Sequence, residues 1–163
     1  VSLVKNTNRI NLTLYASQGT TLPAAGNIDV KLTAANGSYH VDNLFADTQQ
    51  VTYRPFNEPQ ETDGKIVYSL STLRLVQGEN VRLEVTDRTT GRSLLSSSDM
   101  DLIDYLLETL PATMQAQEYL DRQDTWEIEL YLGSNDVFGE TAYTAIMIKI
   151  NGWTVWSSQS GIL

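Results

Sequence analysis

Residues 117–133 read QEYLDRQDTWEIELYLG, and the hydrophobic pattern changes its period within this stretch. Glu118 and Arg122 are four residues apart, which favours a short helix with an ion pair on its surface. From Trp126 onward apolar and polar residues alternate, which indicates a strand with one buried face. The helical half carries little apolar surface, so we expect its stability to come from docking on the rest of the chain. The chain therefore places a helical connection directly before a core strand.

Most of the remaining chain shows the period-two alternation of half-buried strands. Asn36-Gly37, Thr90-Gly91 and Asn151-Gly152 each predict a hairpin, because these residue types tolerate the positive φ angles of tight turns. Pro55 ends a short strand or confines it to a sheet edge, and residues 57–64 are predicted to form a polar surface loop. About nine or ten strands are expected, within residues 9–16, 27–34, 38–41, 50–56, 65–76, 80–96, 125–133 and 141–157.

A helical pattern interrupts the strands and predicts a short helical crossover at about residues 99–123. Ser98 or Asp99 is expected to cap its amino end, and Ser98 with Asp101 matches the capping-box pattern. Pro111 is expected to end the first helix. The apolar residues at helical spacing are Leu102, Ile103, Leu106, Leu107 and Leu110.

Strands at this spacing, with turn residues between them, predict a mainly β protein built as an antiparallel β-sandwich. The helical crossover is too long for a tight hairpin. We therefore expect it to carry the chain across the sandwich or to cover an open sheet edge. A length of 163 residues suits a single domain over residues 1–163.

The composition excludes several classes of function. A net charge of −9 and a pI near 4.4 argue against nucleic acid as a partner, because no basic stripe is available to neutralise phosphates. The absence of cysteine excludes disulfides, thiolate metal sites and cysteine nucleophiles. No apolar run is long enough to span a membrane, and no signal peptide is present, so we expect a mature or trimmed fragment.

The residues that could perform catalysis do not form a recognisable pattern. His40 is the only histidine, and no Gly-x-Ser-x-Gly motif accompanies it, so a surface or cross-strand role is favoured over a catalytic base. Glu127 and Glu129 lie two apart on one strand, which favours the solvent face of that strand over a glycosidase pair. No phosphate-binding loop, dinucleotide fingerprint or zinc spacing occurs. We expect no catalytic residues and no enzyme.

Two acidic segments raise the alternative of a calcium ion, because hard cations need several oxygen ligands. The first segment begins the predicted helix, where capping explains its acidic residues better. The second is the predicted loop at residues 133–140, and a plain polar loop is favoured there. Neither segment is predicted to hold a metal or a cofactor. The residues concerned are Asp99, Asp101 and Asp104 in the first segment, and Asn135, Asp136 and Glu140 in the second.

Trp153 and Trp156 are three residues apart, so they should point to opposite faces of a regular strand. One is expected in the core. The other is available to stack on a sugar or a partner, although a lone exposed tryptophan is weak evidence for a binding site.

Several stretches, in order along nearly the whole chain, resemble the FimB-like fimbrial anchor-subunit family of the fimbrillin pili of Bacteroidales. The most specific are the paired blocks LIDYLL and EYLDRQD and the terminal INGW. The stretches are LVKNTNRINLTLY (3–15), VTYRPF (51–56), STLRLVQ (71–77), RLEV (82–85), DLIDYLL (101–107), QEYLDRQDTWEIELYL (117–132) and IKINGWTV (148–155).

The resemblance implies a β-sandwich of transthyretin-like or Greek-key type and a structural role. It implies that the chain is the carboxy-terminal domain of a longer two-domain lipoprotein at the surface of the outer membrane. That protein would anchor a fimbrium, limit its length and bind other fimbrial subunits. The attachment would use a lipidated cysteine that this chain does not contain.

A pilus role suggests strand addition, in which an exposed sheet edge pairs with a strand of the next subunit. The main alternative is a cell-surface adhesin or glycan-binding module of the fimbrial-tip kind, with exposed aromatics near Trp153, Trp156 or residues 133–140. A third hypothesis, a hydrolase, requires converging carboxylates and an acid with a perturbed pKa.

Overall fold

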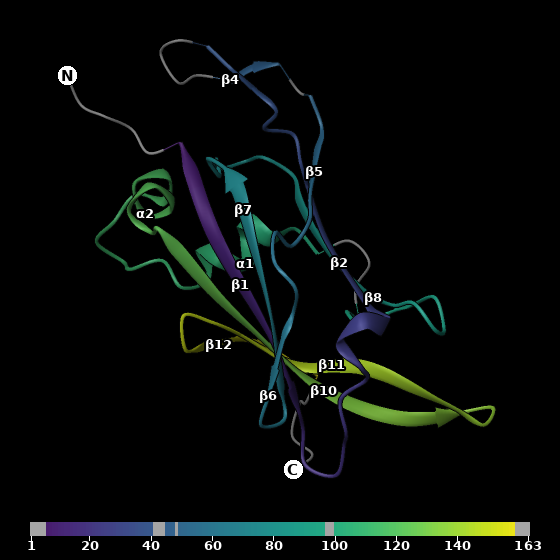
Figure 1. Cartoon of the computed structure of the whole chain (residues 1–163). Helices are drawn as coiled ribbons and strands as arrows, with labels where there is room; N and C mark the ends of the chain where they lie inside the picture. Colours follow the sequence, from purple (N-terminus) through teal and green to yellow (C-terminus); the bar gives the residue numbers. More distant parts are fainter. Residues whose placement is uncertain (1–5, 41–44, 48, 97–99, 159–163) are drawn as a thin grey trace.

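Twelve strands in three sheets make up most of the computed structural model, which describes residues 6–40, 45–47, 49–96 and 100–158 (Figure 1). They are β1 (Thr7–Ala16), β2 (Ile28–Ala34), β3 (Ser38–Tyr39), β4 (Phe45–Asp47), β5 (Val51–Tyr53), β6 (Gln60–Thr62), β7 (Lys65–Leu73), β8 (Val81–Asp87), β9 (Arg92–Ser93), β10 (Thr125–Val137), β11 (Glu140–Ile150) and β12 (Trp153–Ser157). Six strands form one sheet in the order β12-β11-β10-β1-β7-β6, and four form the second in the order β5-β2-β8-β9. The remaining strands, β3 and β4, pair with each other. The predicted β-sandwich is confirmed.

The hydrophobic core lies between the two main sheets and uses one face of each strand. In β10, Trp126, Ile128, Leu130 and Leu132 are fully buried, as their alternation predicts. The strands around it show the same pattern, because side chains on a strand alternate between the two faces of the sheet. Their buried residues are Ile10, Leu12 and Leu14 in β1, Ile66, Tyr68 and Leu70 in β7, Ile28, Val30 and Leu32 in β2, and Val81, Leu83 and Val85 in β8.

One strand pair departs from the predicted antiparallel arrangement. Strands β1 and β10 run parallel, with Ile10 beside Trp126 and Leu14 beside Leu130, whereas the other strand pairs described are antiparallel. A parallel neighbour cannot be reached through a tight turn and needs a long connection. Here the chain arrives at β10 from β9, in the other sheet, through the helical crossover. Side chains alternate with a period of two in parallel and in antiparallel strands alike, so the sequence pattern does not distinguish the two kinds of pairing.

Two of the three predicted hairpin turns are confirmed. Asn151 and Gly152 have φ angles of 48° and 84° and join β11 to β12. Strands β8 and β9 pair across the turn that contains Thr90-Gly91. Both turns use glycine at positive φ, where a Cβ atom would cause strain.

The predicted hairpin at Asn36-Gly37 is wrong, because β2 pairs with β5 and β8 and not with β3. Asn36 is fully buried; its side-chain amide donates to the carbonyl of Arg74 at 3.1 Å, and its oxygen accepts from the Tyr53 hydroxyl at 2.7 Å. A Cβ atom on Gly37 would lie 2.6 Å from the side chain of Val51. Close packing, and not turn geometry, therefore requires these two residues.

Two polar segments predicted as loops contain strand structure. Residues 57–64 include β6, which pairs with β7 across a turn at Asp63-Gly64. Residues 133–140 include the end of β10 and the start of β11. Both segments are largely exposed, so neither shows the alternation that identifies a half-buried strand.

The helical crossover between β9 and β10 contains α1 (Leu102–Leu107) and α2 (Ala116–Arg122), and η1 (Ala25–Asn27) precedes β2. Asp101 caps α1 by accepting a hydrogen bond of 3.0 Å from the Ile103 N–H, whereas the predicted caps Ser98 and Asp99 lie outside the described residues. The predicted pair of Glu118 with Arg122 is confirmed at 2.8 Å. No helix within the described residues is both long enough and apolar enough to cross a membrane.

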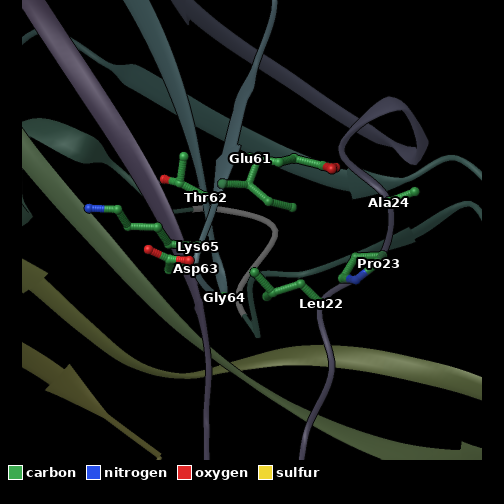
Figure 2. Close-up of a pocket in the computed structure, with 9 residues that line it drawn as sticks. Leu22, Pro23, Ala24, Glu61, Thr62, Asp63, Gly64 and Lys65 are labelled. Carbon is green, nitrogen blue, oxygen red and sulfur yellow. The ribbon is translucent and has the colours of Figure 1, made fainter.

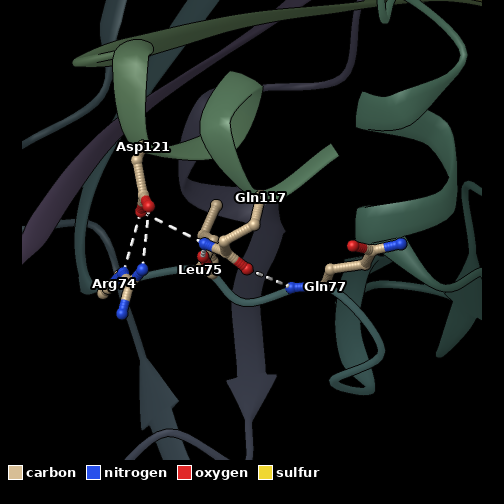
Figure 3. A network of polar contacts seen from close by, with 5 residues as sticks. All are labelled: Arg74, Leu75, Gln77, Gln117 and Asp121. Carbon is tan, nitrogen blue, oxygen red and sulfur yellow. Dashed lines mark hydrogen bonds and ion pairs between the residues drawn. The ribbon is translucent and has the colours of Figure 1, made fainter. Parts of the chain in front are cut away.

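Side chains of α2 dock on the connection between β7 and β8, as Figure 3 shows. The Arg74 guanidinium donates two hydrogen bonds of 2.8 Å to the Asp121 carboxylate. Gln117 accepts from the Gln77 N–H at 2.9 Å and donates to the Leu75 carbonyl at 3.2 Å. On the inner side of α2, Tyr119 and Leu120 are buried, and the Tyr119 ring packs edge-on against Trp126 at 5.5 Å. The expected docking of this short helix is confirmed.

Replacement of Asp121 by Asn is expected to lower the free energy of unfolding by about 1–3 kcal/mol, because the partly buried Arg74 guanidinium loses its anionic partner. Urea denaturation followed by circular dichroism measures this loss. The matched control on the same helix is Glu118→Gln, which removes an exposed ion pair and should cost at most about 0.5 kcal/mol. Equal losses in the two variants would show that the Arg74 contact does not hold the crossover.

Candidate functional site

A hollow beside the β6–β7 hairpin is the first candidate site, because its lining includes Glu61, Asp63 and Lys65. It has a volume of about 290 Å³, and residues 22–24 and 61–66 line it (Figure 2). The Glu61 carboxylate accepts a hydrogen bond of 2.6 Å from the Ala25 N–H and so holds the start of η1. The Lys65 side chain points away from Pro23 and Ala24 in Figure 2. The Glu61 carboxylate and the Lys65 amino group point in opposite directions in Figure 2, so these two groups do not converge as an acid and a base.

The acidic residues considered for calcium have structural roles or are exposed. Asp101 caps α1, and the Asp136 carboxylate accepts a hydrogen bond of 2.8 Å from the Gly139 N–H. Asp99 lies outside the described residues. Across the part of the chain that the structure describes, no three acidic or histidine side chains gather closely enough to hold a metal ion. The other oxygen donors, Asp104, Asn135 and Glu140, are exposed.

His40, Glu127 and Glu129 lie on the protein surface, as predicted. His40 is exposed directly after β3. Glu127 accepts a hydrogen bond of 2.8 Å from the Asn11 side chain, and Glu129 accepts one of 3.3 Å from the Tyr131 hydroxyl. These contacts run across the outer face of the six-stranded sheet, opposite to the buried face of β10. The two glutamates therefore belong to a solvent-facing polar ladder.

The sheet edges are the surfaces that could accept another strand. Strands β12 and β6 are the edges of the six-stranded sheet, and β5 and β9 are the edges of the four-stranded sheet. The longest of these is β12, with five residues, whereas β5 and β6 have three and β9 has two. The start of the crossover borders β8 where β9 ends, because Arg82 and Asp101 form an isolated antiparallel bridge. The crossover thus covers part of one edge and leads the chain into the other sheet.

Trp153 begins the edge strand β12 and is 72% exposed, whereas Trp156 packs against the core. This outcome confirms that the two tryptophans differ in burial. A hollow of about 290 Å³ lies beside Trp153, between β12 and the residues that follow α1. Its lining combines an aromatic ring with a carboxylate and two hydroxyl groups: Glu108, Thr109, Leu110, Trp153, Thr154 and Val155.

Glu79 is a buried acid that the sequence pattern did not distinguish. It is 8% exposed, and its carboxylate lies near the backbone of Val76 and Ala35. Burial raises the pKa of Glu79 to about 7, and the charge of Asp101 acts in the same direction, while the nearby backbone of Val76 and Ala35 opposes the shift. Glu79 lines neither of the hollows described above. A perturbed pKa alone, without a substrate-sized space, does not indicate an active site.

The family model of the fimbrillin-A associated anchor proteins Mfa1 and Mfa2 matches residues 1–159. The minor fimbrium anchoring subunit Mfa2 of Porphyromonas gingivalis is 28% identical over 153 residues, which cover 91% of this chain and 45% of that protein. The solved structure of the fimbrial anchor protein Mfa2 from Porphyromonas gingivalis matches with a TM-score of 0.71 and 25% identity, covering 93% of this chain and 49% of that one.

A second solved structure, from Bacteroides thetaiotaomicron, is described as that of a candidate polysaccharide-binding protein. It matches with a TM-score of 0.76 and 25% identity, covering 96% of this chain and 52% of that chain. This chain therefore spans about half the length of the relatives that it matches.

Replacement of Glu79 by Gln is expected to change how stability depends on pH. The pKa of Glu79 is higher in the folded protein than its ordinary value of 4.5, so folding retains a proton that the unfolded chain releases. The corresponding stability is present below about pH 4.5 and is lost as the pH rises through about 7. Wild-type protein should lose at most about 3 kcal/mol from this group over that range.

Urea denaturation at pH 5 and pH 8 provides the measurement. At pH 8 the Gln variant should be more stable than wild type, and at pH 5 the two should be similar. If both proteins show the same dependence on pH, Glu79 does not titrate as its burial implies.

Proposed function

The chain belongs to the family of fimbrillin-A associated anchor proteins Mfa1 and Mfa2, and from this membership we propose that it is part of a structural subunit that anchors a fimbrium at the cell surface. The single observation that carries the proposal is the family match over residues 1–159, which includes both sheets and the crossover. The surface described above is consistent with this role, because Asp101, Asp136 and Asp121 serve a helix cap, a turn and an ion pair.

The finer parts of the proposal concern the whole protein. We infer that this sandwich is the carboxy-terminal domain of a longer lipoprotein of the outer membrane, held there by a lipidated cysteine outside this chain. The coverage of about half of each relative supports a further domain in those proteins. The anchoring subunit would bind the other subunits of its fimbrium and limit the length of the fibre.

The edge strand β12 is the structural feature best suited to bind such a subunit. Strand addition needs a row of backbone donors and acceptors along an edge, and β12 is the longest of the four edge strands of the two main sheets. Ile150 and Trp153 flank the two-residue turn, so their backbones bond to each other. The next residue, Thr154, is opposite Lys149 and precedes a β-bulge, and from the alternation of an antiparallel ladder we infer that its N–H points away from β11.

The test is binding of the full-length protein to the purified major subunit of the same fimbrium, measured by surface plasmon resonance. Thr154→Pro removes the outward N–H and should weaken binding about tenfold or more, whereas the control Thr154→Val keeps the N–H and should bind like wild type. Absence of binding by the wild-type protein would contradict the anchoring function. Equal binding by the two variants would show that β12 is not the pairing edge.

The alternative of a glycan-binding module is favoured by one specific observation, which is the exposed Trp153 beside its hollow. The ring offers a flat apolar surface for a sugar, and Glu108 and Thr154 offer hydrogen-bonding groups at its side. The relative described as a candidate polysaccharide-binding protein has the same fold.

A glycan array separates the two functions. A glycan-binding module should retain particular oligosaccharides, and Trp153→Ala should lower their affinity about tenfold or more, because the stacking surface is lost. An anchoring subunit should show no glycan binding that depends on Trp153. Thermal unfolding of the variant serves as the control for folding.

A further inference from the structure

The hairpin of β10 and β11 extends beyond the sheet to which it belongs (Figure 1). Pairing of β1 with β10 ends at Ala16 and Leu132, whereas β10 and β11 continue to pair as far as Val137 and Glu140. We call residues 133–144 the ribbon. Five residues of strand extend about 16 Å, so the end of the ribbon stands clear of the sheet edge.

The base of the ribbon packs on the sandwich, Glu140 and Thr141 line a hollow that they share with residues of the sandwich, and the side chain at the turn is exposed. At the base, the Ala145 N–H donates to the Leu94 carbonyl at 2.6 Å, and the Tyr143 ring packs against the core. At the end, Phe138 is fully exposed, with a relative exposure of 101%. The Asp136 carboxylate accepts a hydrogen bond of 2.8 Å from the Gly139 N–H, which stiffens the turn around Phe138. The ribbon therefore presents one large apolar side chain on a supported and locally ordered turn.

Phe138 has an unfavourable backbone conformation and an exposed apolar ring, and the described contacts offset neither. Its φ angle is 54°, in the left-handed region that bulky side chains avoid, and its ring lies in water. Within the described residues, the two other turns of this geometry, at Asp63-Gly64 and Asn151-Gly152, use residues that adopt positive φ readily. A residue that is unfavourable both for its turn and for its exposure to water indicates a role in binding another molecule rather than in folding.

The charge around Phe138 determines which kind of partner suits the ribbon. Asp136 and Glu140 flank the turn, and no Lys or Arg occurs between residues 123 and 148. An anionic lipid surface would repel this arrangement, since basic residues are needed to attract it. A second copy of the chain is also disfavoured, because each copy carries a net charge of −9. A protein surface with an apolar hollow and Lys or Arg at its rim is complementary to it.

We propose that the ribbon is a docking element of the anchoring subunit, in which the Phe138 ring enters an apolar hollow with a basic rim on the adjacent fimbrial subunit. This inference rests on the proposed anchoring function and adds a second contact to the one at β12. The two contacts differ in chemistry. Strand β12 offers backbone donors and acceptors, whereas the ribbon offers an aromatic side chain and two carboxylates. A rigid aromatic side chain at the end of a preordered turn has the properties of an interface hot spot.

The decisive variant is Phe138→Asn in the full-length protein. Asn suits the positive φ angle of this turn, so the folded domain should be retained, while the ring is lost. Binding to the purified major subunit of the same fimbrium should weaken roughly 10- to 100-fold, as for loss of a buried aromatic anchor. The matched control, Phe138→Tyr, keeps the ring and should bind within about threefold of wild type. Surface plasmon resonance gives the affinities, and circular dichroism confirms folding.

A charge variant tests the basic rim independently. Glu140→Gln keeps the size of the side chain and removes one charge, so it should slow association and reduce the dependence of association on salt. If wild type binds and both Phe138→Asn and Glu140→Gln bind as tightly as wild type, the ribbon is not a docking element, although the anchoring function stands. If wild type does not bind the subunit, the anchoring function and the ribbon contact both fail.

Two further measurements test the two other possible partners of the ribbon, which are a lipid surface and a second copy of the chain. Cosedimentation of wild-type protein, but not Phe138→Asn, with vesicles of phosphatidylethanolamine and phosphatidylglycerol would overturn the proposal in favour of a lipid surface. Sedimentation velocity that shows a dimer of wild type and a monomer of Phe138→Asn would overturn it in favour of self-association. The proposal expects neither result.

Discussion

The parallel pairing of β1 with β10 is the contact on which the rest of the structure depends. It sets Leu12 beside Ile128 at the centre of the six-stranded sheet, where both side chains are fully buried. The chain between these two strands is residues 17–124, and its last part, the helical crossover, brings the chain from β9 into the six-stranded sheet. The crossover helix α2 has little apolar surface of its own. On one side its Asp121 bonds to Arg74, and on the other its buried residues pack in the core. The central strand pair, the crossover and the core therefore stabilise one another.

The position of β10 also decides which surfaces face other molecules. Strands β11 and β12 follow β10 through tight turns, so the last of them becomes the edge of the sheet. Strands β10 and β11 are longer than their neighbours, and their excess length forms the ribbon that carries Phe138. One strand order thus produces both an edge with backbone donors and a projecting aromatic side chain. Both features suit binding to another protein.

The candidate surfaces were only partly predictable from sequence. The exposure of one tryptophan of the pair follows from their spacing, but the hollow beside Trp153 depends on Glu108–Leu110, which tertiary packing brings beside it. Phe138 has a weak local signal, because Phe-Gly replaces the Asp-Gly and Asn-Gly of the other turns. That signal becomes meaningful only when the segment is known to be a hairpin and not a loop. Glu79 shows no signal, since burial of a single acid between strands depends on packing from several elements.

The sequence by itself determined the strands with one buried face, the two short helices and the turn at Asn151-Gly152, because side-chain period and positive φ are local properties. It also determined that a family resemblance extends along nearly the whole chain. Only the tertiary structure decided that β1 and β10 run parallel and that Asn36 is buried rather than in a turn. It alone decided, too, that the polar residues 133–140 belong to a projecting ribbon. The β1–β10 pairing joins residues more than a hundred positions apart, and Asn36 bonds to residues 38 and 17 positions away. A local side-chain period records neither strand direction nor the choice of partner.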